Sequence, residues 1–547
     1  MRFFASIFFV LFLFPSFSIW AKNEYPCTIT LFQGSDIAKT MNKSKRRIVI
    51  SSEIDLNGGT MIVSKGKVLE FKQNGSLKNG VIDARQAAIK TNKTGIFDNC
   101  ILKAKNIKAS WFKNIDYSLL LSSQSSFFQF EVDKDIEIKK ECELTAPFKI
   151  ICRNGSIIKD SSPIYIKKTA KGSTIRGVTF DGQWKNGICL WITASDIDLS
   201  SCTFLNHKGD NVYVIYLGRM QHGYNENIKI HGCTFDGMES ITDGVGKGKG
   251  FNAAISSASS YRNIQIYDCL FKNQVGEDDG EGISIAGEIL DNTKSWPNKD
   301  DENTLRYGQL CAKIYRNRFY DMTVSAIKVF GKDIDIYDNY IFNSTWNSER
   351  GGKSLVRVLE AEKVRIENNT FVSTIDVGCL SVMNSSDVLF RRNTFTCNTD
   401  GTRGLPTGSA YFKFQNVKDV MVENIKSDIR QGYVTQNTSV FNIMGGDNVV
   451  VKKCNVKIDN TDCLYQALIG NTYGNMYLEK CTFNVISSCA KWIYVNTRQF
   501  NDAKIHISDV VVNFPNIVPT GLSNQTLSTL PYVIRNLRVN GCGVKKM

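Results

Sequence analysis

The chain has 547 residues, of which 42% are hydrophobic and 22% are charged, and its formal net charge at pH 7 is +14. This excess of positive charge favours an anionic partner, such as a uronate-containing or sulfated glycan. The sequence contains no RNA- or DNA-reading motif, which argues against nucleic acid as that partner.

Residues 1–21 have the pattern of a cleaved secretory signal. One basic residue, Arg2, precedes an apolar run that extends through Phe14, and small residues follow before Ala21. Loss of Arg2 with this segment would lower the net charge by one unit. No later apolar run is long enough to span a membrane. We therefore expect a monomer without a transmembrane segment that is secreted, periplasmic or held at the surface of a bacterium.

Residues 22–60 are predicted to form an N-terminal cap. A basic run at 43–47 leads into the apolar residues 48–50, and the rest of the segment is mixed in composition. Such a segment would cover the open end of the repeated strands described next, which would aggregate if it were exposed. Residues 61–547 contain no linker and are predicted to form a single domain, in which the run 117–121 is a short helix.

A motif of the form Ile-x-Ile-x-x-(Asn or Cys)-x-Phe recurs through this domain, most clearly at Ile228–Phe235. Spacings between copies run from 22 to 48 residues and cluster near 30, which is typical of a solenoid. The Ile-x-Ile alternation places both apolar residues on one side of a strand, and a third apolar run precedes most copies. The sequence therefore predicts an all-β fold, a parallel β-helix with three strands per coil and about 13 regular coils. The sixth positions of the copies are Val178, Cys202, Cys233, Cys269, Asn317, Asn339, Asn369, Asn393, Ile425, Cys454, Cys481, Val510 and Cys542.

The four asparagines among these positions follow one another in consecutive copies. A buried amide without partners costs about 1–3 kcal/mol, so four inward-facing amides are expected to stack and hydrogen-bond to one another. The preceding cysteines would continue this stack as small buried side chains. The alternative is that these asparagines lie in surface turns.

The sixteen cysteines occupy repeat positions through a long chain and do not form a compact cluster. This spacing favours free thiols over a disulfide framework. The chain has no Cys-x-x-Cys pair, and its four histidines show no metal-ligand spacing.

Four carboxylates lie within residues 277–281, directly before a predicted strand. They cannot all stay ionised at close range without a cation, so either Ca²⁺ is bound or one carboxylate has a raised pKa. The predicted ligands of this Ca²⁺ site are Asp278 and Asp279. The alternative is a solvated turn.

A second group of polar residues lies on the strand that opens each coil. When these strands are aligned by their inward residues, one outward position forms a line across the sheet. Neighbouring Lys328 and Arg357 would lie about 5 Å apart, and their repulsion of roughly 3 kcal/mol at a dielectric constant near 20 would lower the pKa of the lysine. Lys328 is therefore a candidate base, and the alternative is a solvated positive face whose charges are satisfied by loop carboxylates. The outward line consists of Ser284, Lys328, Arg357, Ser381, Lys413 and Asn442.

Two oversized coils carry long insertions near the same strands, and such insertions are common places for function. Candidate substrate-binding residues are Lys247 and Lys249 in the first insertion and Trp296 in the second. Ser284 and Lys413 in the outward line are candidates for the same role. His207 and His222 lie in predicted turns beside this region and are weaker candidates for an acid or a base.

The repeat resembles the right-handed parallel β-helix superfamily of pectate lyases and polygalacturonases, and the block 68–83 with Trp111-Phe112 is similar to the N-terminal region of many secreted bacterial β-helix proteins. Segments 209–211, 280–287 and 326–328 stand in the order of the polygalacturonase Gly-Asp-Asp, Gly-His-Gly and Arg-Ile-Lys motifs. This resemblance implies a right-handed fold and a substrate cleft on this face, with Asp210, Glu281 and Lys328 in it. The sequence departs from the motifs at three positions, where Asn211 replaces an acid, Glu281 a histidine and Ala326 an arginine.

Pectate lyases use Ca²⁺ and a basic residue on the same face, which is similar to the combination found here. The leading hypothesis is a polysaccharide lyase that cleaves an acidic glycan, with Lys328 as the base and a metal ion or Arg357 neutralising the uronate carboxylate. The first alternative is a glycoside hydrolase that uses two carboxylates among Asp210, Asp278, Asp279 and Glu281. The second alternative is a non-catalytic glycan-binding or surface-structural β-helix.

Overall fold

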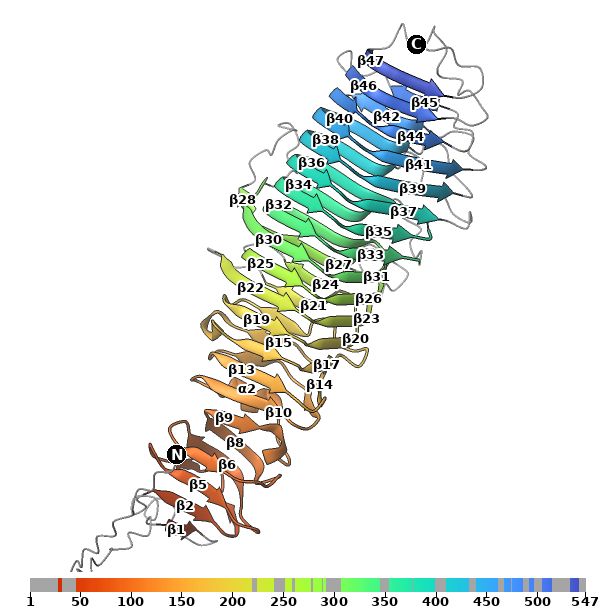
Figure 1. The fold of residues 1–547 in the computed structure, drawn as a ribbon. Helices are drawn as coiled ribbons and strands as arrows, with labels where there is room; N and C mark the ends of the chain where they lie inside the picture. Colours follow the sequence, from red (N-terminus) through yellow and green to blue (C-terminus); the bar gives the residue numbers. More distant parts are fainter. Residues whose placement is uncertain are drawn as a thin grey trace, which may run out of the picture.

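The computed structural model describes most of the chain, and its strands stack into one elongated column that runs from the red to the blue end of the sequence (Figure 1). Segments 1–27, 241–250 and 541–547 lie outside the described residues, so the signal prediction and the copy at Cys542 cannot be followed in the structure. The structure describes residues 28–31, 46–218, 224–240, 251–257, 261–276, 279–287, 289–291, 306–344, 354–375, 377–398, 410–431, 439–460, 467–473, 475–485, 491–495, 504–513 and 532–540.

The column is a parallel β-helix, as the repeat predicts, and it is right-handed, as the family resemblance implies. From β10 onward every coil adds one strand to each of three parallel sheets, and each strand pairs with the equivalent strand of the next coil. The first sheet contains β9 (Asn106–Lys108), β10 (Phe128–Val132), β13 (Phe148–Cys152), β16 (Thr174–Arg176), β19 (Ile197–Ser200), β22 (Asn225–His231), β25 (Tyr261–Tyr267), β30 (Gln309–Tyr315) and β43 (Asn475–Glu479). The second contains β11 (Ile136–Ile138), β14 (Ile157–Asp160), β17 (Thr179–Asp181), β20 (Thr203–Gly209), β23 (Thr234–Ser240), β26 (Leu270–Val275), β31 (Arg318–Met322), β33 (Tyr340–Asn343), β35 (Thr370–Ser373), β37 (Thr394–Asn398), β39 (Lys426–Gln431), β41 (Asn455–Asn460) and β44 (Thr482–Val485).

The third sheet holds the opening strand of each coil, and we call it the leading sheet. Its first strands are short, whereas five later ones continue through a bend into the first sheet, so that one long strand serves both sheets. The leading sheet contains β12 (Cys142–Leu144), β15 (Ile164–Ile166), β18 (Leu190–Ile192), β21 (Val212–Leu217), β24 (Phe251–Ser257), β27 (Asp279–Ala286), the long strands β32 (Ser325–Tyr337), β34 (Ser354–Glu367), β36 (Gly378–Arg391), β38 (Ala410–Glu423) and β40 (Ser439–Lys452), then β42 (Ala467–Tyr473) and β45 (Lys491–Val495). β46 (Lys504–Asn513) pairs with strands of the first and second sheets, and β47 (Tyr532–Asn540) pairs with β46.

Parallel stacking extends into the predicted cap. There β2 pairs with β5 in register, so residues 47–50 already belong to a stack of strands. The helix predicted at 117–121 is present as α2 (Tyr117–Ser122), whose N-cap Asp116 accepts hydrogen bonds from two backbone N–H groups. The N-terminal sheets contain β1 (Thr28–Leu31), β2 (Arg47–Ile50), β5 (Val68–Phe71) and β7 (Ala88–Lys90), and β3 (Glu53–Asp55), β4 (Thr60–Ile62), β6 (Ser76–Ala84) and β8 (Phe97–Ala104). The remaining elements are the 3₁₀ turns η1 (Ala109–Trp111) and η2 (Lys168–Ala170) and the antiparallel pair β28 (Ile289–Asp291) and β29 (Arg306–Tyr307).

The inward stack of asparagines is confirmed. All four are buried, and the Oδ1 atom of Asn339 accepts hydrogen bonds from both N (3.0 Å) and Nδ2 (3.1 Å) of Asn317. Asn369 and Asn393 repeat this pattern in the next two coils. Each Nδ2 also donates to a backbone carbonyl of the preceding coil, such as that of Ile336 for Asn369 (3.0 Å). The amides therefore satisfy one another inside the column, and the surface-turn alternative is wrong.

The bend beside this stack has a local cause. The residue that precedes each stacked position has left-handed backbone angles, with φ of 54° at Arg316, 57° at Asp338 and 56° at Asn368. Asp and Asn adopt this conformation more easily than most residues because their short polar side chains can hydrogen-bond locally. One such residue per coil turns the chain from the first sheet into the second.

The Phe position of the motif builds a continuous part of the core. Rings in five successive coils lie nearly parallel, with centroids 4.6–5.3 Å apart, because parallel pairing in register places equal residues above one another. The stacked rings are Phe180, Phe204, Phe235, Phe271 and Phe319.

The cysteines that the structure describes are free thiols, as predicted. Among the described residues no helix is long and apolar enough to cross a membrane.

Candidate functional site

The outward line predicted from the sequence exists, and we call it the outward row. The register pairs Ser284 with Lys328, Lys328 with Arg357, and Arg357 with Ser381, and Lys413 and Asn442 follow in the next two coils. Neighbouring strands lie about 4.8 Å apart, so these residues succeed one another at that interval along the leading sheet. The register confirms the predicted placement of these six side chains, while their roles remain a prediction.

Glu281 joins this row through ion pairs, so a carboxylate neutralises part of its positive charge, as the alternative to a catalytic Lys328 proposed. Its Oε1 atom lies 3.4 Å from Nζ of Lys328 and 3.7 Å from Nη1 of Arg357. The side chain of Glu281 is only 2% exposed, whereas those of Lys328 and Arg357 are 13% and 20% exposed. A buried carboxylate between two cations offsets the repulsion on which the sequence argument about Lys328 relied. Lys328 is therefore one member of a buried ion-pair network.

Space for the Glu281 side chain exists because the residues at the same register position in the following coils are small. Glu281 pairs with Ser325, and Ser354 of the coil after that pairs with Gly378. A Cβ atom on Gly378 would lie 2.4 Å from Oγ of Ser354, so a larger residue there would require the neighbouring coils to move. The carboxylate thus lies in a row of small residues beside the outward row, with the long side chains of Lys328 and Arg357 next to it.

The fold changes the proton affinity of Lys413. Burial, followed by the nearby Arg357 guanidinium, lowers the pKa of Lys413. Both effects disfavour the ammonium form, because a charged group loses solvation when it is buried and is repelled by a like charge. Within this row Lys413 therefore has a structural reason to act as a neutral amine, and sequence patterning had instead selected Lys328.

The row continues toward the N-terminus as a group of aromatic side chains that the sequence analysis missed. Tyr165 pairs with Trp191, Trp191 with Tyr216, and Tyr216 with Ser256, which pairs with Ser284. We call Tyr165, Trp191, Tyr213 and Tyr216 the aromatic shelf; all four are partly exposed. Adjacent ring centroids are 4.8–5.4 Å apart.

Gly218 is needed where Trp191 crosses the next coil. A Cβ atom on Gly218 would lie 2.1 Å from Nε1 of Trp191, so the indole ring lies directly against the backbone there. Alignment of the strands Ile164–Ile166, Leu190–Ile192 and Val212–Leu217 with the later leading strands would have revealed the aromatic shelf. These early coils lack the full motif, so the repeat does not mark their leading strands in the sequence.

The other predicted site residues lie away from the outward row or outside the described residues. Asp210 is exposed in the turn between β20 and β21, two coils before Glu281, and the structure does not bring the two carboxylates together. Asp279 begins the backbone of β27, but its side chain lies outside the described residues, as does all of Asp278. The described structure also omits Lys247, Lys249, Trp296 and His222.

The prediction that His207 lies in a turn is wrong. It belongs to β20, and its side chain is fully buried inside the column, because parallel pairing aligns it with the inward Met238 of β23. It cannot contact a substrate on the leading sheet.

Two hollows on the described surface lie away from the row. One lies beside α2 and is lined by residues such as Tyr117, Lys134 and Lys159, and another lies over the first sheet beside Asp335 and Arg365. Neither contains a residue of the outward row or the aromatic shelf. The described part of the row is thus a sheet face, which offers successive equivalent positions to an extended ligand.

No family model matches the chain, and no curated protein matches it. Solved structures that are similar include tailspike protein 3 of bacteriophage CBA120, with 10% identity over 87% of this chain and 58% of the tailspike chain and a TM-score of 0.33. The chain thus spans less than two thirds of that tailspike. A second is the surface adhesin PfbA of Streptococcus pneumoniae, with 11% identity over 84% of this chain and 94% of that chain and a TM-score of 0.27. A third is the alginate lyase AlyF-OU02, with 12% identity over 82% of this chain and 85% of that chain and a TM-score of 0.29. Likeness at this level carries no argument about this chain.

Proposed function

We propose that this protein is an extracellular, carbohydrate-active β-helix that binds an acidic glycan along the outward row and cleaves it by β-elimination. The observation that carries the proposal is the gathering of Lys328, Arg357 and Lys413 on one sheet face within four successive coils. These cations match the carboxylates of a uronate polymer, and the overall charge of +14 favours the same class of ligand. Export and a monomeric state are part of the proposal.

The chemistry divides between the cations and one neutral amine. Lys328 and Arg357 would bind the uronate carboxylate, and their positive charge would stabilise the negative charge that develops when the C5 proton leaves. Lys413 would take that proton, because its lowered pKa makes the neutral amine more available. The C5 electron pair then forms the C4–C5 double bond, the C4–O4 bond breaks, and the Lys413 ammonium returns the proton to the leaving oxygen.

Glu281 would act as a positioning residue in this scheme. Its carboxylate holds Lys328 and Arg357 at 3.4 Å and 3.7 Å, so both cations are in place before the substrate binds. A Ca²⁺ ion bound by Asp278 and Asp279 is the alternative to Lys328 and Arg357 for neutralising the uronate carboxylate. A chelator distinguishes the two, because the cationic pair does not depend on a metal ion.

The test of the function is product analysis on a panel of acidic and neutral polysaccharides. β-Elimination creates a double bond conjugated with the carboxylate, so we expect ultraviolet absorbance to appear together with new reducing ends. Reducing ends without absorbance would move the assignment to a hydrolase that uses two carboxylates, and binding without either product would support a non-catalytic glycan-binding protein. Loss of activity in a chelator with recovery in added Ca²⁺ would favour the metal.

Binding to acidic glycans is expected to weaken as salt concentration rises. The cations of the row are partly exposed, and the Debye length falls from about 10 Å at 0.1 M to about 3 Å at 1 M ionic strength. Affinity electrophoresis in gels that contain polygalacturonate, a glycosaminoglycan or a neutral glucan measures this directly. Equal retention by acidic and neutral polymers would show that the positive charge does not select the ligand.

The aromatic shelf is expected to bind sugar rings of the same glycan through their apolar faces. Trp191→Ala should weaken binding about tenfold, since loss of an aromatic contact typically costs about 0.5–1.5 kcal/mol in addition to the buried area. Trp184, which is 47% exposed but does not belong to the row, provides the matched control as Trp184→Ala. Equal loss of affinity in both variants, measured by isothermal titration calorimetry, would remove the aromatic shelf from the binding surface.

A further inference from the structure

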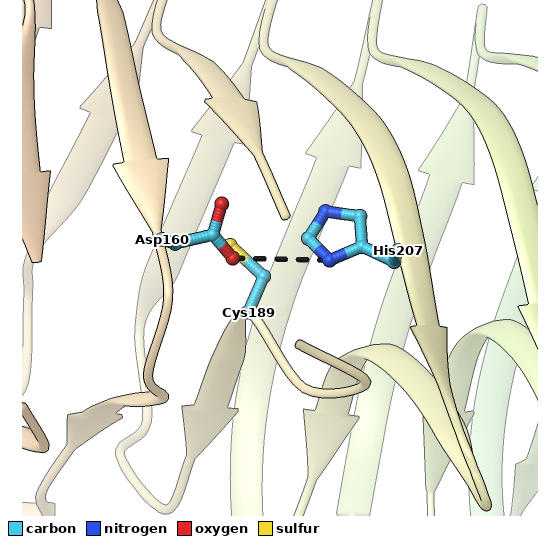
Figure 2. A group of neighbouring side chains, drawn as sticks. All are labelled: Asp160, Cys189 and His207. Atoms are coloured by element: carbon cyan, nitrogen blue, oxygen red, sulfur yellow. Dashed lines mark ion pairs between the residues drawn. The ribbon is translucent and has the colours of Figure 1, made fainter. Parts of the chain in front are cut away.

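Three side chains with metal-binding atoms meet inside the column, away from the outward row (Figure 2). Asp160 ends β14, Cys189 directly precedes β18, and His207 lies in β20, so each comes from a different coil. One carboxylate oxygen, the Cys189 sulfur and one ring nitrogen lie within 4.8 Å of one another. Oδ2 of Asp160 is 3.8 Å from Nδ1 of His207.

This cluster is fully enclosed by the protein. All three side chains have no exposed surface, and within the described structure Oδ1 of Asp160 and Nε2 of His207 have no hydrogen-bond partner. Burial raises the pKa of Asp160 to about 8 and lowers the pKa of His207 to about 4, and it also raises the pKa of the Cys189 thiol. Two polar atoms of the cluster are therefore buried without a hydrogen-bond partner, which is costly in an apolar interior.

We propose that Asp160, Cys189 and His207 bind one divalent transition-metal ion, with Zn²⁺ as the best match. Carboxylate oxygen, thiolate sulfur and imidazole nitrogen are the three ligand types that Zn²⁺ takes in proteins. One carboxylate, one thiolate and one neutral imidazole carry two negative charges, which balance a divalent cation and leave a neutral centre in an apolar interior. On binding, Cys189 and Asp160 each release a proton to solvent.

The distances agree with a tetrahedral site after a small contraction. Zinc bonds to oxygen and nitrogen of about 2.0–2.2 Å place two tetrahedral ligands of these types about 3.3–3.5 Å apart, so the Oδ2–Nδ1 distance of 3.8 Å would have to shorten by a few tenths of an ångström. Nδ1 of His207 lies 3.0 Å from the backbone oxygen of Asn186, a hydrogen bond that a metal bond at Nδ1 would replace. The side chain of Asn186 donates to Oδ2 of Asp160 (3.2 Å), which fixes the orientation of the carboxylate in the way that outer-shell groups do in metal sites.

Such an ion would cross-link three coils that carry the aromatic shelf. Cys189 is two residues from Trp191 in the same segment, and β20 leads directly into β21 with Tyr213 and Tyr216. These coils lack the asparagine stack, which begins only at Asn317. A buried metal ion would therefore supply, in the early coils, polar cross-linking that the amides supply later.

The test is metal content and spectroscopy of the full chain, with no activity readout. Protein that is loaded with Zn²⁺ and then dialysed against metal-free buffer is expected to retain about one zinc ion per chain by mass spectrometry of the metal, with a raised melting temperature. Co²⁺ in place of Zn²⁺ should give a thiolate-to-cobalt charge-transfer band. Cys189→Ser should abolish this band, and Cys189→Ser and His207→Gln should each lower the retained metal to background.

Cys202→Ser is the matched control, because Cys202 is also a buried free thiol, in the same coil as His207, but lies outside the cluster. This variant is expected to keep both the metal and the charge-transfer band. If Cys189→Ser fails to fold, the band in the unmodified chain still reports a thiolate ligand, and its persistence in Cys202→Ser excludes that thiol. Retention of no metal by the loaded chain, or equal retention by Cys189→Ser and the unmodified chain, would overturn the proposal.

Discussion

Replacement of Lys413 by Arg is expected to reduce formation of the unsaturated product at least about 100-fold, which is the low end of what a positioned base contributes. Arg keeps the positive charge, but its guanidinium stays protonated at any pH at which the protein is folded, so it cannot accept the C5 proton. Glycan binding and its salt dependence should therefore stay close to those of the unmodified chain. Ultraviolet absorbance and affinity electrophoresis on the same preparations separate the two effects.

The pH dependence of the unmodified chain provides a second check on Lys413. Because the base must be neutral, and because burial and Arg357 lower the pKa of Lys413, the rate should rise with pH through that lowered pKa and then level off. Lys418→Arg is the control, since Lys418 lies on the same strand, where it continues into the first sheet. Full activity in Lys413→Arg would exclude this lysine as the base and return that role to Lys328, where Lys328→Ala would then be expected to abolish the product.

Replacement of Asn369 by Leu is expected to destabilise the column by at least about 2 kcal/mol, because a buried polar group left unpaired costs about 1–3 kcal/mol. The loss affects several partners at once. Oδ1 of Asn369 accepts from N and Nδ2 of Asn339, and its Nδ2 donates to the carbonyl of Ile336 and to Oδ1 of Asn393. Leucine can replace none of these hydrogen bonds, and Asn369 is only 1% exposed.

Hydrogen–deuterium exchange tests this prediction locally, because unfolding of a repeat protein need not be a single two-state transition. The amide of Asn339 should lose protection in Asn369→Leu, together with a lower melting temperature. Asn398→Leu is the control, since Asn398 is exposed at the end of β37, the strand that pairs with β35, which begins directly after Asn369. Unchanged exchange at Asn339 would mean that the amide stack contributes little to holding adjacent coils together.

The fold was predictable because every coil repeats the same local pattern. The Ile-x-Ile alternation, the left-handed residue at the bend and the Phe position each recur, so errors at one weak copy are corrected by the others. The asparagine stack was predictable for the same reason, since an inward amide has acceptable partners only when its neighbours are also amides. The order of the outward row followed from the register, because equal positions of parallel strands must lie side by side.

The candidate site was predictable only in part. The residues of the row were identified, but the buried position of Glu281 between Lys328 and Arg357 was not, because it depends on which coils leave room with small residues such as Ser325 and Gly378. Sequence patterning also did not single out Lys413 as a base, although the fold lowers the pKa of Lys413. Both outcomes depend on burial and on distances across coils, which no local pattern contains.

The sequence by itself determined that the chain is a parallel β-helix, where its coils turn and which side chains face outward, since strand periodicity and in-register stacking leave few other arrangements. Only the tertiary structure decided which charges meet and which groups are buried. Asp160, Cys189 and His207 are up to 47 residues apart in the chain and share no motif. They meet inside the column because they lie in three successive coils, at neighbouring positions around the column. The meeting of such distant side chains follows from the rise and closure of the coils, which the local sequence does not encode.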